Sequence, residues 1–496
     1  MTGASRALTL LAGPILGLCL FLVLPDDYIG PEGTVLLLPA AAKAAAAVGL
    51  WMAIWWLTQA IAVYATALLP LIIFPLAGVA PISEAADAYA HPLIYLFLGG
   101  FILALALERW NVHRRLALAV LGRVGTEPAV VIAAFMGIAA FTSMWVTNTA
   151  TAIMLLPVAT SVLSLVRSEE GEGDVFNRFS LCLLLGIAYA ASIGGIGTII
   201  GTAPNLFVVS FIERQTGTEI SFLRWMAIGV PLVLVFVPLT WWLLVRRIYS
   251  LPQGRFAGMG EQLEKLRGQQ GPMDRGAKMT VIIFCLTALA WISRPLLNDL
   301  SVGGWQPLAG LTDPGIALLS ALALFVTPAN LREGVFLMDW QTAVRLPWGL
   351  LILFGGGLSL AAAVDGTGFS AFLGSQVGAL GSLPGPVMVC LVVALMIFLT
   401  ELTSNTATTA TLIPVLYAVA EGLKLDPILL VVPAAIAASC AFMLPVATPP
   451  NAIVFGTGLV TVPQMSRAGL RLNIVGVVLI TLLAYAVIQP LLRIEL

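Results

Sequence analysis

Long apolar segments recur along the whole chain, and they restrict what it can fold into more than any other feature. A helix needs roughly 20 apolar residues to cross a bilayer. In lipid every backbone polar group must be satisfied internally, so these segments are expected to be helical. Only 10% of the 496 residues are charged, against roughly 25% in soluble domains, which excludes a soluble enzyme and a disordered chain. The expected spans are residues 7–25, 40–62, 64–80, 92–108, 180–212, 222–245, 279–297, 314–328, 347–363, 427–458 and 472–492.

Two further apolar stretches, residues 129–166 and 385–420, are too long for one helix and are interrupted midway by small polar residues. Each is expected to form two half-length helices that enter and leave the membrane on the same side. With the N-terminus in the cytoplasm, most of the 24 Lys and Arg residues then fall on the cytoplasmic side, as membrane proteins prefer. The expected fold is an all-α polytopic membrane protein with about 11 transmembrane helices, two re-entrant hairpins, a cytoplasmic connector at residues 246–278 and an external C-terminus.

The chain contains an internal duplication. TNTATAIMLLPV at residues 147–158 matches SNTATTATLIPV at residues 404–415 at seven of twelve positions. The same offset of 257 residues aligns FLGGFILALA with FGGGLSLAAA, and an offset of 246 residues aligns GTAPNL with ATPPNA. Five crossings and one hairpin separate the repeats, so the halves are expected to be inverted. Inverted repeats are typical of secondary transporters, whose sites lie at the repeat interface.

Polar residues gather where the two arms of each interrupted stretch should meet. Four residues separate Ser143 from Thr147 and Thr400 from Ser404, so each pair of hydroxyls would share a helix face. Hydroxyl and amide oxygens suit a small hard cation. GTAPN and ATPPN each place proline where a membrane helix should continue, and this frees nearby carbonyl groups to bind an ion. The two halves therefore predict two cation sites.

The same clusters also suit an anion, because helix N-termini carry partial positive charge and asparagine and threonine donate hydrogen bonds. Two facing half-sites would fit a ligand with two anionic ends. The alternative is that these groups only link helices, as serine, threonine and asparagine often do in membranes. The duplicated Asn-Thr beside a matched proline favours ligand binding. Glu401 is the most conspicuous acid nearby, but Met144 stands at its position in the first half, so a structural role is preferred over proton coupling.

These residues resemble the divalent anion/sodium symporter family, which includes dicarboxylate, citrate and sulfate transporters. The family carries a Ser-Asn-Thr triad at the tip of each of two re-entrant hairpins, and LFGGG, GTAPN and ATPPN extend the resemblance over nearly the whole chain. The two triads here are Thr147, Asn148, Thr149 and Ser404, Asn405, Thr406. Thr147 departs from the serine of the family; it keeps the hydroxyl and adds a methyl group.

The resemblance implies two or more sodium sites and a substrate site between the hairpins. The first sodium site would use Ser143, Thr147, Asn148 and the carbonyl of Gly201. The second would use Thr400, Ser404, Asn405 and the carbonyl of Ala447. The substrate carboxylates would meet Asn148, Thr149, Asn405, Thr406 and Thr448.

The resemblance also implies a homodimer in a cell inner membrane that works as an elevator, in which a transport domain carrying both hairpins slides against a scaffold. Scaffold helices with an interfacial arm would occupy residues 1–124, and further scaffold helices residues 279–384. The two hairpins with their transport-domain helices would occupy residues 125–245 and 385–496.

The expected function is sodium-coupled transport of C4-dicarboxylates such as succinate, malate or fumarate. A sodium-independent exchanger and a sulfate or tricarboxylate carrier are the alternatives within the family, and a channel is a less favoured class. An enzyme is not expected, because His91 and His113 lie outside both polar clusters and no nucleophile–base pair converges there. The formal net charge of −1 gives no electrostatic basis for binding nucleic acid.

Overall fold

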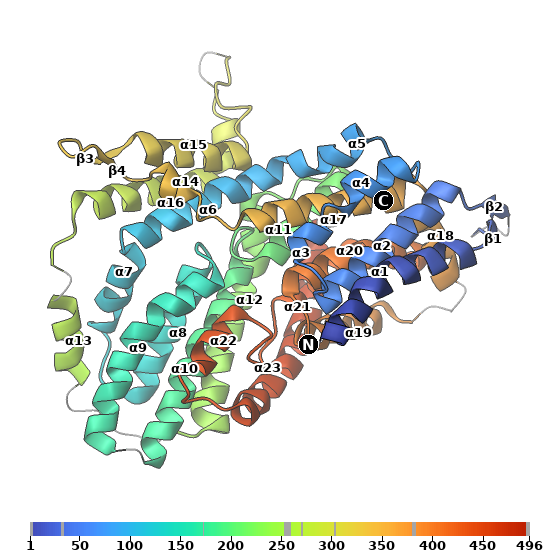
Figure 1. The fold of residues 1–496 in the computed structure, drawn as a ribbon. Coiled ribbons are helices and arrows are strands. Elements are labelled where there is room, and N and C mark those ends of the chain that lie inside the picture. Colours follow the sequence, from blue (N-terminus) through green and yellow to red (C-terminus); the bar gives the residue numbers. More distant parts are fainter. Residues whose placement is uncertain are drawn as a thin grey trace.

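The computed structural model describes residues 3–30, 34–171, 173–251, 259–268, 271–301, 304–378 and 383–492. The connector expected at residues 246–278 lies partly outside these ranges, and the chain end from residue 493 lies wholly outside them. The described part is almost entirely helical, as Figure 1 shows. It has eight helices long and apolar enough to cross a membrane, together with shorter apolar helices of 10–17 residues. This confirms a polytopic, mostly helical membrane protein.

The first half runs from α1 to the π-helical segment η3. Its elements are α1 (Gly3–Val23), β1 (Asp27–Ile29), β2 (Val35–Leu37), α2 (Ala40–Thr58), α3 (Val63–Thr66), α4 (Leu69–Leu76), α5 (Ile82–Asp87), η1 (Ala88–Ala90), α6 (Pro92–Arg109), α7 (Val112–Leu121), α8 (Pro128–Ser143), α9 (Asn148–Glu170), α10 (Asp174–Gly194), η2 (Gly195–Gly197), α11 (Ala203–Thr216), α12 (Phe222–Trp242) and η3 (Leu243–Ile248).

The second half runs from α13 to α24. Its elements are α13 (Met259–Gly268), α14 (Arg275–Asn298), α15 (Asp313–Val326), β3 (Pro328–Asn330), β4 (Val335–Phe336), α16 (Trp340–Ala343), α17 (Trp348–Gly366), α18 (Phe369–Gly378), α19 (Gly385–Thr400), α20 (Asn405–Gly422), α21 (Ile428–Ala438), α22 (Pro449–Phe455), α23 (Val462–Leu483), η4 (Ala484–Ile488) and α24 (Gln489–Leu492). The two short antiparallel ladders, β1–β2 and β3–β4, were not predicted from the sequence.

The duplication is visible in the helix boundaries. α7, α8 and α9 begin at residues 112, 128 and 148, and α18, α19 and α20 begin 257 residues later, at 369, 385 and 405. The interfacial arm expected at the end of residues 1–124 contains α7. Its counterpart α18 was not predicted, because its sequence is less charged.

Each interrupted stretch forms a helical hairpin, α8–α9 in the first half and α19–α20 in the second. Both first arms, α8 and α19, have 16 residues. At 1.5 Å per residue this is about 24 Å, which is less than the roughly 30 Å thickness of a bilayer core. The second arms are longer and carry Pro157 and Pro414 at matching positions. The first arms therefore have the length expected of re-entrant hairpins, whereas the second arm α9 is itself long enough to cross the membrane.

Three of the expected spans are interrupted, which corrects the sequence prediction. The segment 64–80 divides into α3 and α4. The segment 180–212 divides into α10, η2 and α11, and the segment 427–458 divides into α21 and α22. The new helices start with Pro204 and Pro449 at their first turns. Proline cannot donate a hydrogen bond to a preceding turn but fits the first turn of a helix, so the chain breaks before it and restarts there.

The first hairpin packs around α10, whose membrane-length segment is completely buried in the protein. Figure 1 shows α8, α9 and α10 side by side. α10 also contacts α12 in the same half and α22 in the second half of the chain. The close approach depends on a glycine, because a Cβ on Gly194 would lie 2.4 Å from the Cα of Ala140 on α8. In the second half, α20 packs against α18, α21 and α11. The two halves therefore interlock rather than form separate bodies.

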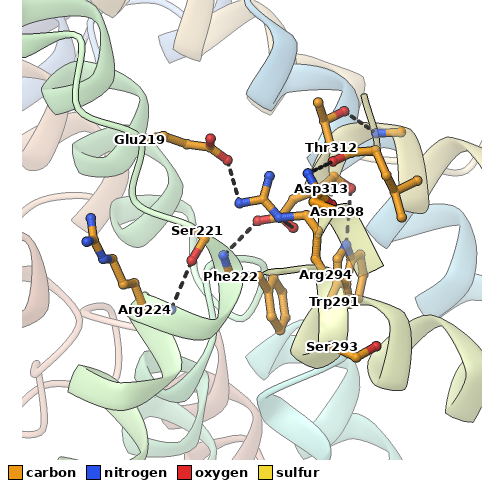
Figure 2. A network of polar contacts seen from close by, with 12 residues as sticks. Glu219, Ser221, Phe222, Arg224, Trp291, Ser293, Arg294, Asn298, Thr312 and Asp313 are labelled. Atoms are coloured by element: carbon orange, nitrogen blue, oxygen red, sulfur yellow. Dashed lines mark hydrogen bonds and ion pairs between the residues drawn. The ribbon is translucent and has the colours of Figure 1, made fainter. Parts of the chain in front are cut away.

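A buried ion-pair network joins the start of α12 to α14 and α15 (Figure 2). The guanidinium of Arg294 on α14 lies 2.8 Å from a carboxylate oxygen of Glu219 and 2.9 Å from one of Asp313. The other oxygen of Asp313 accepts a 2.7 Å hydrogen bond from the backbone N–H of Phe222. Trp291 donates its indole N–H to the Asp313 carbonyl at 3.1 Å. Charge pairing compensates both Arg294 and Asp313 for the loss of water.

Candidate functional site

A cavity of about 1020 Å³ lies where both hairpin tips meet both helix breaks. Residues from the two halves line it together, although more than 200 positions separate them in the sequence. Eight of the predicted site residues are in its wall. These are Thr147, Asn148, Thr149, Gly201, Ser404, Asn405, Thr406 and Ala447.

The remaining three predicted residues, Ser143, Thr400 and Thr448, lie behind the cavity wall. Ser143 and Thr400 are completely buried, and Thr448 is 3% exposed. Each lies at the end of a helix: Ser143 ends α8, Thr400 ends α19, and Thr448 caps α22. The structure therefore brings all of the predicted site residues into one region.

The same hydrogen bond closes the tip of each hairpin. The Ser143 hydroxyl donates to the amide oxygen of Asn148 at 2.6 Å, and the Thr400 hydroxyl donates to that of Asn405 at 2.6 Å. The bond ties the end of the first arm to the start of the second. It also places a hydroxyl oxygen and an amide oxygen side by side, and oxygen atoms are the ligands that hard cations take.

The two helix breaks are also held in matching ways. In the first half the side-chain NH₂ of Asn205 donates to the carbonyls of Gly195 and Thr198, at 3.0 and 2.8 Å. In the second half the NH₂ of Asn451 donates to the carbonyls of Ala441 and Leu444, at 3.2 and 3.0 Å. Each bonded pair of carbonyls is related by the offset of 246 residues. A buried asparagine thus replaces the helical hydrogen bonds that the break removes.

Gly195 allows the first break to lie against the first hairpin tip. A Cβ at this position would be 2.5 Å from Oδ1 of Asn148 and 2.6 Å from Cγ2 of Thr202. The backbone of the break, from Gly195 to Gly201, therefore packs directly against the side-chain amide of Asn148 at the hairpin tip. This brings together the side-chain and backbone oxygens of the predicted first cation site.

Helix N-termini supply positive potential at the same cavity. The first residues of α9, α11 and α20 line its wall, and the Thr147 hydroxyl caps α9 by accepting from the N–H of Ala150 at 3.3 Å. An N-terminus carries roughly half a positive charge and several unpaired N–H groups. Such ends attract carboxylates and other anions without a fixed cation. Among the described residues, no group of three or more His, Cys, Asp or Glu could hold a metal ion.

Sequence reasoning missed several residues of the cavity. Thr202 lines it, and its hydroxyl oxygen accepts a 3.3 Å hydrogen bond from Ser439 of the other half. Thr202 could have been found, because it holds the position in GTAPN that Thr448 holds in ATPPN. Glu108 and Arg345 also line the cavity and lie 3.3 Å apart. Glu108 aligns with Asp365 at the offset of 257 residues, but Ala88 stands at the position of Arg345, so the repeat does not predict the pair.

Comparisons with known proteins agree with these features. Residues 29–494 match the family described as sodium:sulfate symporter transmembrane region. The sodium-dependent dicarboxylate transporter SdcS of Staphylococcus saprophyticus is 38% identical over 491 residues, which covers 98% of this chain and 92% of that protein. The SdcS protein of Staphylococcus aureus strain bovine RF122 is 36% identical and covers 99% of this chain and 93% of its own.

Among solved structures, the YdaH transporter of Alcanivorax borkumensis superimposes with a TM-score of 0.57 at 14% identity, over 97% of each chain. This likeness concerns the fold alone. The family match and the full-length relatives confirm the resemblance found in the sequence. The chain therefore belongs to the sodium:sulfate symporter (divalent anion/sodium symporter) family, a family of membrane transporters and not of enzymes.

Proposed function

We propose that the protein carries C4-dicarboxylates such as succinate, malate or fumarate across the membrane, driven by sodium. The observation that carries the proposal is the cavity built from two equivalent hairpin tips, each with the same closing hydrogen bond. A substrate with two carboxylates matches a site with two equivalent ends. Relatives named as sodium-dependent dicarboxylate transporters, at 36–38% identity over nearly the full length, support the choice of cargo.

Sodium ions are cargo in this proposal, and each half supplies one site from its own oxygens. The first site takes Ser143, Thr147, Asn148 and the Gly201 carbonyl. The second takes Thr400, Ser404, Asn405 and the Ala447 carbonyl. An ion bound there would need its oxygens to turn toward it, so the hydroxyl protons of Ser143 and Thr400 would rotate away from the amides.

The dianion lies between the tips. One carboxylate accepts hydrogen bonds from Asn148 and Thr149, and the other from Asn405 and Thr406, with Thr448 at the second break. The N-termini of α9 and α20 and the two sodium ions offset its charge. Without the ions, the two carboxylates would face only neutral groups and partial charges at the hairpin tips, and Arg345 elsewhere in the cavity wall is already paired with Glu108. This dependence couples substrate binding to sodium binding.

Transport follows an elevator mechanism in a homodimer, with the two hairpins, α10–α12 and α21–α23 moving as one unit against the other helices. The close packing of α10 with α8, α9, α12 and α22 supports a single moving body. The N-terminus is cytoplasmic and the C-terminus external, in accord with the distribution of Lys and Arg.

The test is uptake of radiolabelled succinate into proteoliposomes with an inward sodium gradient, compared with equimolar potassium. Accumulation that requires the sodium gradient is the expected result. Uptake that ignores sodium but requires dicarboxylate inside the vesicles would identify an exchanger. Equilibration without accumulation under either condition would identify a channel. Sulfate and citrate as competitors define which anion the site prefers.

A Thr147→Ser variant is expected to transport at least as well as the wild type and to need no more sodium. Serine keeps the hydroxyl that caps α9 and removes only the methyl group. Removing the hydroxyl itself, in Thr147→Ala, is expected to weaken the cap by about 1 kcal/mol and to raise the sodium requirement. The measurement is the sodium concentration for half-maximal uptake in the three proteins. Loss of transport in the serine variant would show that the methyl group is needed for packing.

A further inference from the structure

Glu401 has no counterpart in the first half, and its carboxylate is fully engaged with the second helix break. The side chain follows the site residue Thr400 directly and is only 3% exposed. Its carboxylate oxygens accept hydrogen bonds from three consecutive backbone N–H groups, those of Phe442 at 2.7 Å, Met443 at 2.9 and 3.0 Å, and Leu444 at 3.2 Å. Asn473 on α23 donates a further bond at 2.8 Å.

These bonds lead to the predicted ion ligand in one further step. The carbonyl of Leu444, whose N–H is bound to Glu401, accepts from the backbone N–H of Ala447 at 3.2 Å. The same carbonyl accepts from the side chain of Asn451 at 3.0 Å. The carboxylate therefore fixes the turn that leads to Ala447, which lines the cavity and whose carbonyl is the predicted ion ligand. Hydrogen bonds to a charged acceptor are about twice as strong as neutral ones, so the turn is held firmly.

The first half fixes the equivalent turn with a different residue. Met144, which aligns with Glu401, uses its backbone carbonyl, and this accepts a hydrogen bond from the hydroxyl of Thr198. The Thr198 hydroxyl oxygen also accepts from the backbone N–H of Gly201 at 3.1 Å. Thr198 aligns with Leu444, which has no hydroxyl. In both halves a side-chain hydrogen bond links the hairpin to the helix break. In the first half the side chain belongs to the break, at Thr198, and in the second half it belongs to the hairpin, at Glu401.

From these two sets of hydrogen bonds we infer that Glu401 is a positioning residue for the second cation site. Thr198 has the same role at the first cation site. The inference rests on the proposed sodium-coupled function. Glu401 touches neither ion nor substrate in this scheme; it keeps the backbone of residues 442–447 in the shape that binds the ion. The backbone of the second site is then held by a carboxylate, and the backbone of the first site is held by a hydroxyl.

The test compares Glu401→Gln with Thr198→Val in the full-length protein. A glutamine places an NH₂ donor against backbone N–H donors, and a valine removes the hydroxyl at nearly constant volume. The readout is the sodium concentration that gives half of the sodium-induced rise in melting temperature, together with the succinate KM at saturating sodium. Glu401→Gln is expected to raise the sodium midpoint about tenfold and to change the succinate KM less than about twofold. Thr198→Val is expected to shift the midpoint in the same direction.

Glu421→Gln is the matched control, because it removes an exposed carboxylate from the same hairpin without touching either break. It is expected to leave the sodium midpoint unchanged. If Glu401→Gln does not fold, Asn473→Ala removes one of the bonds to the carboxylate and is expected to raise the midpoint about threefold. A glutamine variant that melts lower by the same amount with and without sodium would overturn the inference and leave Glu401 a general stabilising residue. A wild type that sodium does not stabilise would instead overturn the proposed function.

Discussion

Asn405→Ala is expected to abolish sodium-driven succinate uptake, with a loss of at least about 100-fold in kcat/KM, while the protein remains folded. The Asn405 side chain accepts from Thr400 at 2.6 Å and lines the cavity, so in the proposed site it serves an ion and a carboxylate together. Two interactions with charged groups, at roughly 1.5–3 kcal/mol each, account for a loss of this size. Asn148→Ala is expected to give an equal loss, because the first tip has the same bond.

The measurement is initial uptake in proteoliposomes, with the elution volume on size exclusion as the check on folding. Thr411→Val is the control for these variants. Thr411 lies on α20 beyond the tip, and its hydroxyl donates within the helix, to the carbonyl of Ala407 at 2.8 Å. It is expected to transport within about twofold of the wild type. Normal transport by either asparagine variant would contradict the assignment of the hairpin tips to the transport site.

Arg294→Ala is expected to lower the unfolding free energy by about 3–5 kcal/mol, which is the cost of leaving a buried charge without its partner. The side chain of Asp313 is 4% exposed and would lose its cation, whereas Glu219 is more than half exposed and would be solvated. The measurement is the melting temperature of the solubilised protein. Arg224→Ala, which removes an exposed arginine from the start of α12, is expected to melt like the wild type.

A double variant separates the loss of the network from the burial of a lone charge. Arg294→Ala combined with Asp313→Ala removes both charges, so it is expected to be more stable than Arg294→Ala alone. A single variant that melts with the wild type would show that the network does not hold α12 to α14 and α15.

Hydropathy and the repeat were enough to predict the helical fold and to pair the two hairpins. The repeat also located the tips, because both carry the same polar residues at a fixed offset. The breaks before α11 and α22 were harder to place as breaks, because the residues between the helices are themselves apolar or small and extend the hydropathy signal. Only the two prolines, Pro204 and Pro449, marked them.

Contacts that have no repeat partner could not be predicted from the sequence. The bonds of Glu401 to residues 442–444 reach 41 to 43 residues along the chain and end on backbone N–H groups, which leave no trace in residue identity. The pair of Glu108 with Arg345 spans 237 residues, and the repeat does not predict it because Ala88 aligns with Arg345. Such contacts depend on how helices pack in three dimensions, and a pattern within one segment does not report that packing.

The hydrogen bonds that both halves share also indicate which features of the chain are older than the duplication. The serine or threonine bond to the tip asparagine and the buried asparagine of each helix break occur at equivalent positions, so they are most simply inherited from one ancestral half. Two copies of that ancestor would have met as a symmetric pair with two identical sites. The ties of Thr198 and Glu401 differ, so at least one of them changed after the duplication. In a fused chain the two proposed sites no longer have to match, so each is free to acquire its own ion affinity.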